Sequence, residues 1–185
     1  MRRAHLVGLT PVGIEIKKAG RVLDYLETLP FVDKDRFAFY GLSYGGFTAL
    51  WTGPAEPRFK AVICSGHFND WNLKTTDLTE GTSFLFHKDT FDMFNFDILN
   101  KFNHSTLAAL VPPRAFMVEI GSRDGIVMEP RRFVDAELAR VTELYAKLGI
   151  PEKGRIARFD GPHKIDGTEA YPFLDKMLNW TPPRR

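Results

Sequence analysis

Apolar residues along this chain of 185 residues follow two spacings, one typical of helices and one typical of buried strands. Between residues 11 and 29 they recur at helical spacing, after a Thr10-Pro11 start and before Pro30, which predicts a helix. Helical spacing recurs later, at 133–148 and 168–179. Short apolar runs predict strands at 36–40, 59–64, 115–120 and 156–159. Because these strands alternate with helices, the sequence predicts an α/β fold with a mostly parallel sheet flanked by helices.

The spacing loosens between residues 66 and 110, where phenylalanine and tryptophan are dense. A loop this long and this aromatic is not expected to stay in water, so we expect a small helical lid or wall over the functional site. Phe68 and Trp71 are the predicted substrate-contacting residues. Aromatic residues can also simply complete the core, and both roles remain open for different members of this segment.

Composition narrows the class of protein. With 44% hydrophobic residues and a net charge of +2, the chain is expected to form one domain over residues 1–185. The basic residues are dispersed, which does not favour nucleic-acid binding. Neither a signal peptide nor an apolar stretch of membrane-spanning length is visible, so no membrane contact and a cytoplasmic location are expected. The lone cysteine, Cys64, excludes a disulfide framework.

The most informative motif is Gly41-Leu42-Ser43-Tyr44-Gly45-Gly46, placed between a predicted strand and a predicted helix. In a G-x-S-x-G turn the glycines allow a strained bend and let strand and helix pass closely, so that the serine hydroxyl projects outward. Ser43 is therefore the predicted nucleophile.

A serine hydroxyl needs an imidazole to take its proton and a carboxylate to orient that imidazole. Ser43, Asp124 and His163 each follow a different predicted parallel strand, so all three should meet at one edge of the sheet. Glu119 lies inside a strand and is expected to pair with a neighbour, and Asp160 is too close in sequence to His163. Asp124 is preferred over both as the orienting acid.

Two further predictions concern binding groups. The backbone N–H of Tyr44 begins the helix after the elbow and should hold the oxyanion of the tetrahedral intermediate. Several polar residues in the aromatic segment could suggest a metal site, but their spacing fits no known ligand pattern, and solvated side chains are expected instead. They are His67, Asp70, His87, Asp89, Asp92 and His104. No cofactor or metal is predicted.

The chain resembles the α/β-hydrolase superfamily from about Thr10 to Trp180. Its elbow, the stretch from Pro112 to Gly125 and the Gly161-Pro162-His163 loop are similar to bacterial acetyl-xylan-esterase-like and dienelactone-hydrolase-like esterases. Gly45-Gly46 is also similar to prolyl-oligopeptidase-type peptidases. The resemblance implies hydrolysis of carboxylic esters, and the predicted triad would carry out this reaction through an acyl-enzyme on Ser43. Peptide or amide hydrolysis, and a non-catalytic remnant, are the alternatives.

The departure from that pattern lies before the elbow, where the resemblance implies several more strands and a loop that gives a second oxyanion N–H. This chain has the appearance of a truncated α/β-hydrolase fold. An uncovered sheet edge and bare apolar faces would favour a homo-oligomer. Slow turnover, limited to activated short-chain esters, is the expected consequence of a missing oxyanion donor.

Overall fold

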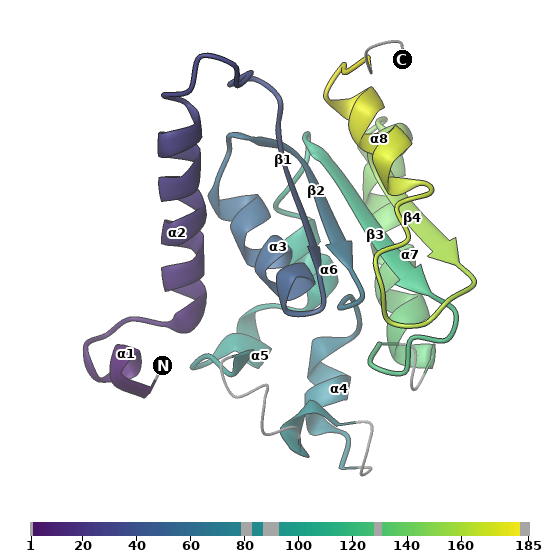
Figure 1. The fold of residues 1–185 in the computed structure, drawn as a ribbon. Helices are drawn as coiled ribbons and strands as arrows, with labels where there is room; N and C mark the ends of the chain where they lie inside the picture. The colour runs from purple at the N-terminus through teal and green to yellow at the C-terminus, as the bar shows by residue number, and fades with distance from the viewer. Residues whose placement is uncertain (1, 79–82, 87–92, 128–130, 182–185) are drawn as a thin grey trace.

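A sheet of four parallel strands lies at the centre of the computed structural model, which describes residues 2–78, 83–86, 93–127 and 131–181 (Figure 1). The strands are β1 (Phe37–Leu42), β2 (Phe59–Ser65), β3 (Ala115–Gly121) and β4 (Gly154–Phe159). Their spatial order is β1-β2-β3-β4, so each strand pairs with the next along the chain. All four carboxyl ends therefore meet at the same edge, the lower one in Figure 1. The predicted α/β class is confirmed.

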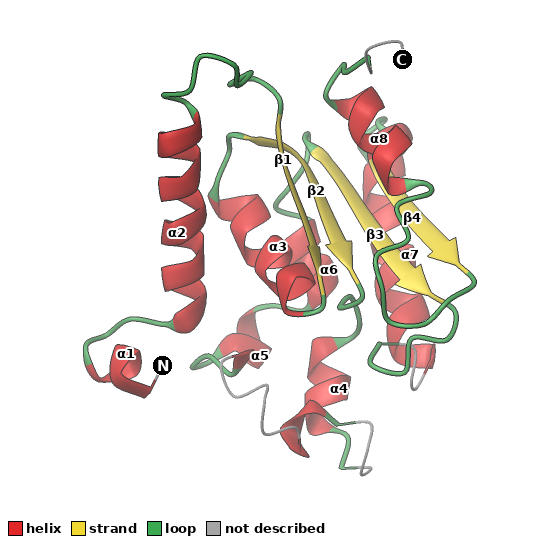
Figure 2. Cartoon of the chain, in the orientation of Figure 1, coloured by secondary structure: helices red, strands yellow, loops and turns green. Residues whose placement is uncertain are grey.

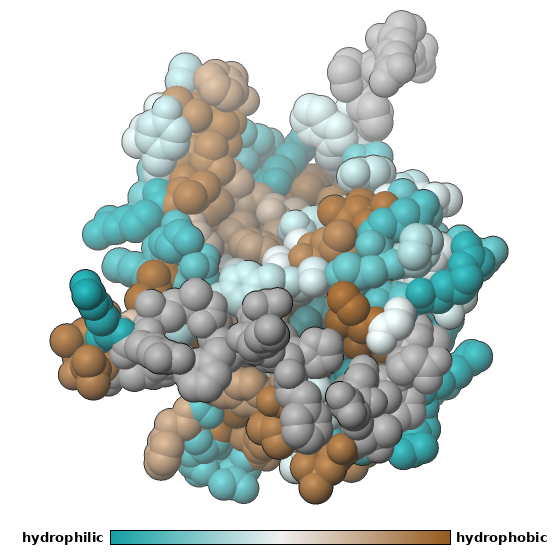
Figure 3. Space-filling view, turned by 60° about the horizontal axis from the view of Figure 1, so that its bottom comes forward, coloured by the Kyte–Doolittle hydropathy of each residue, from teal (hydrophilic) through white to brown (hydrophobic). Residues whose placement is uncertain are grey.

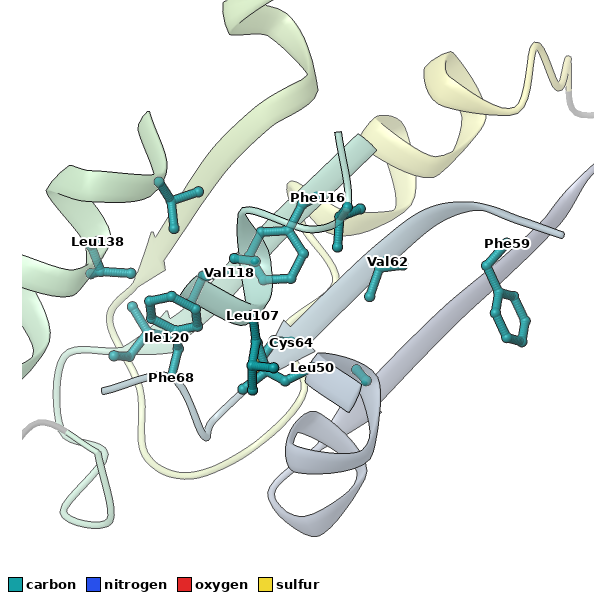
Figure 4. Packing of buried hydrophobic residues seen from close by; sticks show 14 of the residues in the cluster. Leu50, Phe59, Val62, Cys64, Phe68, Leu107, Phe116, Val118, Ile120 and Leu138 are labelled. Atoms are coloured by element: carbon teal, nitrogen blue, oxygen red, sulfur yellow. The ribbon is translucent and has the colours of Figure 1, made fainter. Parts of the chain in front are cut away.

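Helices cover both faces of this sheet (Figure 2). On one face lie α3 (Tyr44–Ala55), α6 (His104–Ala108) and α7 (Arg131–Lys147), and on the other lies α8 (Ala170–Met177). Alternate strand residues serve the two faces: Val62 and Cys64 join the main core, whereas Ala61 and Ile63 face the α8 side. Figure 4 shows the main core, where side chains of α3, α6 and the central strands meet.

The helix α2 (Pro11–Leu26) begins as the sequence predicts. The Thr10 side chain accepts a hydrogen bond from the Gly13 N–H at 3.0 Å, and Pro11 occupies the first helical position. The predicted helix ran to Leu29, but the regular helix ends at Leu26 and turns follow it. A short helix, α1 (Arg2–Leu6), precedes α2, which packs on α3 beside the sheet (Figure 1).

The aromatic segment between β2 and β3 contains α4 (Trp71–Thr76), a 3₁₀ turn η1 (Phe84–Phe86), α5 (Ile98–Lys101) and α6. Leu107, Ala108 and Val111 at its end are buried in the main core. This part of the predicted lid is therefore a layer of the domain itself. A second 3₁₀ turn, η3 (Pro151–Lys153), leads into β4.

Candidate active site

Ser43 lies between the end of β1 and the start of α3, at φ 59° and ψ −117°. L-amino acids rarely adopt this combination, so the backbone stores strain at the candidate nucleophile. The Ser43 N–H donates to the Ser65 carbonyl at 2.9 Å and its own carbonyl accepts from the Phe47 N–H at 2.9 Å. These bonds hold the bend against β2 on one side and against the first turn of α3 on the other.

Two glycines make the bend possible. A Cβ at Gly41 would collide with the Gly45 carbonyl, and a Cβ at Gly46 would lie 2.5 Å from the Ser65 carbonyl oxygen. Any side chain at these positions would push α3 away from β1 and β2. The elbow that the sequence predicts is therefore present, with Gly41 and Gly46 in the positions of closest backbone approach.

Asp124 and His163 meet at the same edge of the sheet. The His163 Nδ1 lies 2.8 Å from the Asp124 Oδ2, and Asp124 is 1% exposed. Its other oxygen, Oδ1, accepts the Ile126 N–H at 3.0 Å. A buried carboxylate bound in this way fixes the orientation of the imidazole and favours the proton on Nδ1.

The imidazole of His163 lies over Gly66, the residue that follows β2. A Cβ at Gly66 would be 2.9 Å from the His163 Cε1 and 2.8 Å from the Leu42 Cδ1. Leu42 directly precedes Ser43, so the ring stands beside the elbow. With Nδ1 engaged by Asp124, Nε2 is the other ring nitrogen available for proton exchange.

Tyr44 is the first residue of α3, so its backbone N–H lies at the positive end of the helix dipole, directly after the nucleophile. Its ring packs on Phe47, with centroids 5.7 Å apart. The position of Tyr44 is as the sequence predicts, and its role as an oxyanion donor stays a prediction.

The structure places Phe68 and Trp71 in hydrophobic clusters. Phe68 is fully buried and packs on Phe116, with ring centroids 6.0 Å apart (Figure 4). Trp71 is 3% exposed and packs on Phe84 and His104. Their rings present almost no surface to a substrate in this arrangement, and both serve the packing beneath the site.

His67 and His104 are buried rather than solvated, contrary to the expectation for this segment. Their ring centroids are 5.2 Å apart, and both contact Trp71. The His104 Nδ1 accepts the Asn69 N–H at 3.0 Å. Burial, with a smaller contribution from His163, lowers the pKa of His67 to about 3, and burial holds the pKa of His104 well below its ordinary value. Both rings are therefore neutral at physiological pH.

The remaining polar residues of that group have other roles or lie outside the described part. Asp70 caps α4 by accepting the Leu73 N–H. His87, Asp89 and Asp92 lie outside the described residues. Within the described ranges, no three His, Cys, Asp or Glu side chains are grouped to hold a metal ion. No described helix is both long and apolar enough to cross a membrane.

Glu119 has more hydrogen-bond partners than the sequence analysis predicted. It is 1% exposed, and its carboxylate accepts hydrogen bonds from Tyr40, Ser65 and Gly167. The expectation that it pairs with neighbours is confirmed. The sequence signal was a lone acid within an apolar strand, but the identity of its partners depends on tertiary structure.

Comparison with known proteins finds relatives both in sequence and in fold. A curated relative from Bacillus subtilis (strain 168), "Putative hydrolase YtaP", is 27% identical over 178 residues, which are 94% of this chain and 56% of that protein. A glucuronoyl esterase of carbohydrate esterase family 15 from Caldicellulosiruptor kristjansonii is 22% identical, with a TM-score of 0.62 over 89% of this chain and 49% of its own. The glucuronoyl esterase from Sporotrichum thermophile is 17% identical, with a TM-score of 0.68 over 92% and 52%.

These solved structures share the α/β-hydrolase fold with the chain, as the sequence resemblance implied. The chain spans about half the length of the relatives it matches. The model of the prolyl oligopeptidase family, Peptidase_S9, matches residues 15–152, which include the elbow, β2, β3 and Asp124. The chain belongs to the prolyl oligopeptidase family.

Proposed function

We propose that this chain carries the catalytic triad of a serine carboxylesterase, with Ser43 as nucleophile, His163 as general base and acid, and Asp124 as the orienting carboxylate. The observation that carries the proposal is the 2.8 Å contact between His163 Nδ1 and a buried Asp124 at the edge where the strained Ser43 elbow lies. Titratable groups arranged in these roles are typical of acyl transfer.

The reaction follows from the positions of the three groups. The Ser43 Oγ attacks the ester carbonyl carbon while the His163 Nε2 takes the hydroxyl proton. The carbonyl oxygen becomes an oxyanion, which the Tyr44 N–H stabilises. The intermediate collapses as His163 gives its proton to the departing alcohol oxygen. Water, deprotonated by the same imidazole, then hydrolyses the acyl-Ser43 ester and restores the serine.

One oxyanion donor is assigned within this chain, and loss of one donor typically costs about 10²–10³ in turnover. We therefore propose substrates with good leaving groups and short acyl chains. This choice does not depend on a substrate wall made by Phe68 or Trp71, whose rings are buried.

Peptide or amide hydrolysis is the second candidate, because the matching family is that of prolyl oligopeptidase. The same Ser43 and His163 would serve, but an amine is a poorer leaving group than an alcohol. Purified protein should be assayed on p-nitrophenyl acetate and butyrate and on matched aminoacyl p-nitroanilides, beside Ser43→Ala. We expect ester hydrolysis that the variant lacks. Faster cleavage of the anilides would favour the peptidase.

We also propose that a second copy of the chain covers the β1 side of the sheet. β1 is an edge strand, and α2 beside it exposes Val22 and Tyr25, which are 55% and 64% exposed. Figure 3 shows apolar residues gathered along this helix, at the upper left. Val22 and Tyr25 line a groove on this helix. The full lining is Leu9, Gly13, Ile14, Lys17, Lys18, Arg21, Val22 and Tyr25. An apolar groove beside an open strand edge favours association.

A further inference from the structure

A buried carboxylate next to the candidate triad takes no part in the proton transfers described above. Glu119 lies in β3, on the opposite face from the core residues Val118 and Ile120, and is 1% exposed. Burial of an acid is costly unless its oxygens are hydrogen-bonded. The partners of Glu119 therefore indicate what the carboxylate holds in place.

One oxygen of Glu119 fixes neighbouring strands. Its Oε2 accepts the Tyr40 hydroxyl of β1 at 2.6 Å and the Ser65 hydroxyl of β2 at 2.7 Å. Burial and the adjacent Glu119 raise the pKa of Tyr40, so that the phenol keeps its proton and donates it to the carboxylate. These bonds anchor the carboxylate rigidly within the sheet.

The other oxygen reaches the loop that carries His163. Oε1 accepts the Gly167 N–H at 2.9 Å in a bond that is buried. Gly167 has φ +78°, and a Cβ there would collide with the Tyr171 ring. Because the Gly167 carbonyl also accepts the Tyr171 N–H at 3.0 Å, the Glu119 bond fixes the point where the loop enters α8.

The same loop has a second anchor on the other side of His163. The Gly161 carbonyl accepts the Arg123 N–H at 2.9 Å, directly before Asp124. The loop that bears the imidazole is thus held by hydrogen bonds on both sides of His163, one beside Asp124 and one at Glu119. The backbone of Glu119 contributes again, because its carbonyl accepts the N–H of Gly66, the residue beneath the ring, at 3.0 Å.

We propose that Glu119 is a positioning residue for His163: it holds the far end of the histidine loop and the backbone under the ring, and so keeps the imidazole between Asp124 and Ser43. This inference rests on the proposed serine hydrolysis. Glu119 touches neither the substrate nor the reacting atoms. It acts only through the loop.

The test compares Glu119→Ala and Glu119→Gln with Glu137→Ala. Glutamine can accept the Gly167 N–H with its oxygen and donate to the Tyr40 and Ser65 hydroxyls with its amide nitrogen. Glu137 is a matched control, because it is fully buried but binds the Ser105 N–H in α6 and Arg140 in α7. Both alanine variants remove a hydrogen-bonded buried acid, and both should lose stability.

Three measurements on folded protein separate positioning from stability. They are kcat and KM for p-nitrophenyl acetate, amide hydrogen exchange of the peptide that contains Gly167, and the downfield proton resonance of the His163 Nδ1–H. In Glu119→Ala we expect kcat to fall about 10- to 100-fold, as small misplacements of a catalytic group do. KM should change little, exchange at Gly167 should become faster, and the Nδ1–H resonance should broaden. Glu119→Gln should restore all three, and Glu137→Ala should change none.

The proposal is overturned if Glu119→Ala loses no more kcat than Glu137→Ala, or if the Nδ1–H resonance is the same in both. The resonance and the exchange rate need no turnover. If the wild-type protein hydrolyses no ester, but Glu119→Ala still broadens the resonance and Glu119→Gln restores it, the positioning role stands and the esterase proposal fails. If esters are hydrolysed and Glu119→Ala changes neither the resonance nor the exchange rate, the esterase proposal stands and the positioning role fails.

Discussion

The carboxyl edge of the sheet and the flank beside β1 differ in how their side chains are partnered. At the carboxyl edge, Asp124, His163 and Glu119 have hydrogen-bond partners from separate segments of the chain. Along the flank, β1 pairs with β2 and with no other strand among the described residues, and apolar residues of α2 are exposed. The hydrogen bonds at the carboxyl edge come from within this chain, whereas the exposed apolar side chains of the flank support the proposed contact with a second copy.

The largest effect is expected on kcat, from disrupting the Asp124–His163 pair at the carboxyl edge. Asp124→Asn keeps the size of the side chain but favours the wrong tautomer of His163, and a triad change of this kind costs about 10⁴ in kcat. Initial rates on p-nitrophenyl acetate measure it.

Asp160→Asn is the matched control for that substitution. Asp160 is exposed and pairs with Arg123 at the surface of the same loop pair, so its loss should leave kcat nearly unchanged. Equal rates for Asp124→Asn and the wild-type protein would remove Asp124 from the mechanism.

A smaller effect is expected from the influence of pH on stability, through His67, which is buried behind the carboxyl edge. Its pKa is about 3 in the folded protein, against about 6.5 in an unfolded chain. Between these pH values the imidazole binds a proton in the unfolded state but not in the folded state. The contribution of neutral His67 to the free energy of unfolding is therefore complete above pH 6.5 and is lost as the pH falls. From pH 7.5 to 5.0 the free energy of unfolding should drop by about 2 kcal/mol through His67. His104 acts in the same direction.

Urea unfolding of the wild-type protein and of His67→Phe, at both pH values, isolates this contribution. Phenylalanine suits the surrounding aromatic cluster and cannot be protonated. The stability difference between the two proteins should shift in favour of the variant at the lower pH. If the free energy of unfolding falls equally in both proteins between the two pH values, His67 does not lower stability in acid.

The smallest expected effect concerns the flank. Changing both Val22 and Tyr25 to Glu should weaken association of two copies by about tenfold or more, which corresponds to about 1.4 kcal/mol. Light scattering over a range of concentrations measures it. Leu148→Glu is the control, because Leu148 is 51% exposed but follows α7, outside the groove on α2. A wild-type protein that stays monomeric at all concentrations would contradict a homo-oligomer.

The sequence allowed the strands, the elbow and the sheet edge to be predicted, because each depends on local patterns. Apolar runs bounded by turns indicate buried strands, and Gly41 and Gly46 lie at a close crossing that any side chain would disturb. Asp124 and His163 could be placed because parallel strands bring their following loops to one edge.

The aromatic segment was harder to interpret because its apolar residues lack a clear period. Without that period, the sequence cannot say whether Phe68 or Leu107 faces a substrate or the core, and the structure buries both. The partners of Glu119 were also beyond prediction. They come from β1, β2 and the loop before α8, and only the sheet register brings them together.

The most direct test of the central claim is the reaction of the folded protein with a fluorophosphonate, located by peptide mass spectrometry and compared with Ser43→Ala and Asp124→Asn. The account predicts a single adduct on the peptide that contains Ser43, absent from Ser43→Ala and formed far more slowly in Asp124→Asn. An unmodified Ser43, under conditions that label a reference serine hydrolase, would show that the serine is not activated and would favour a non-catalytic remnant.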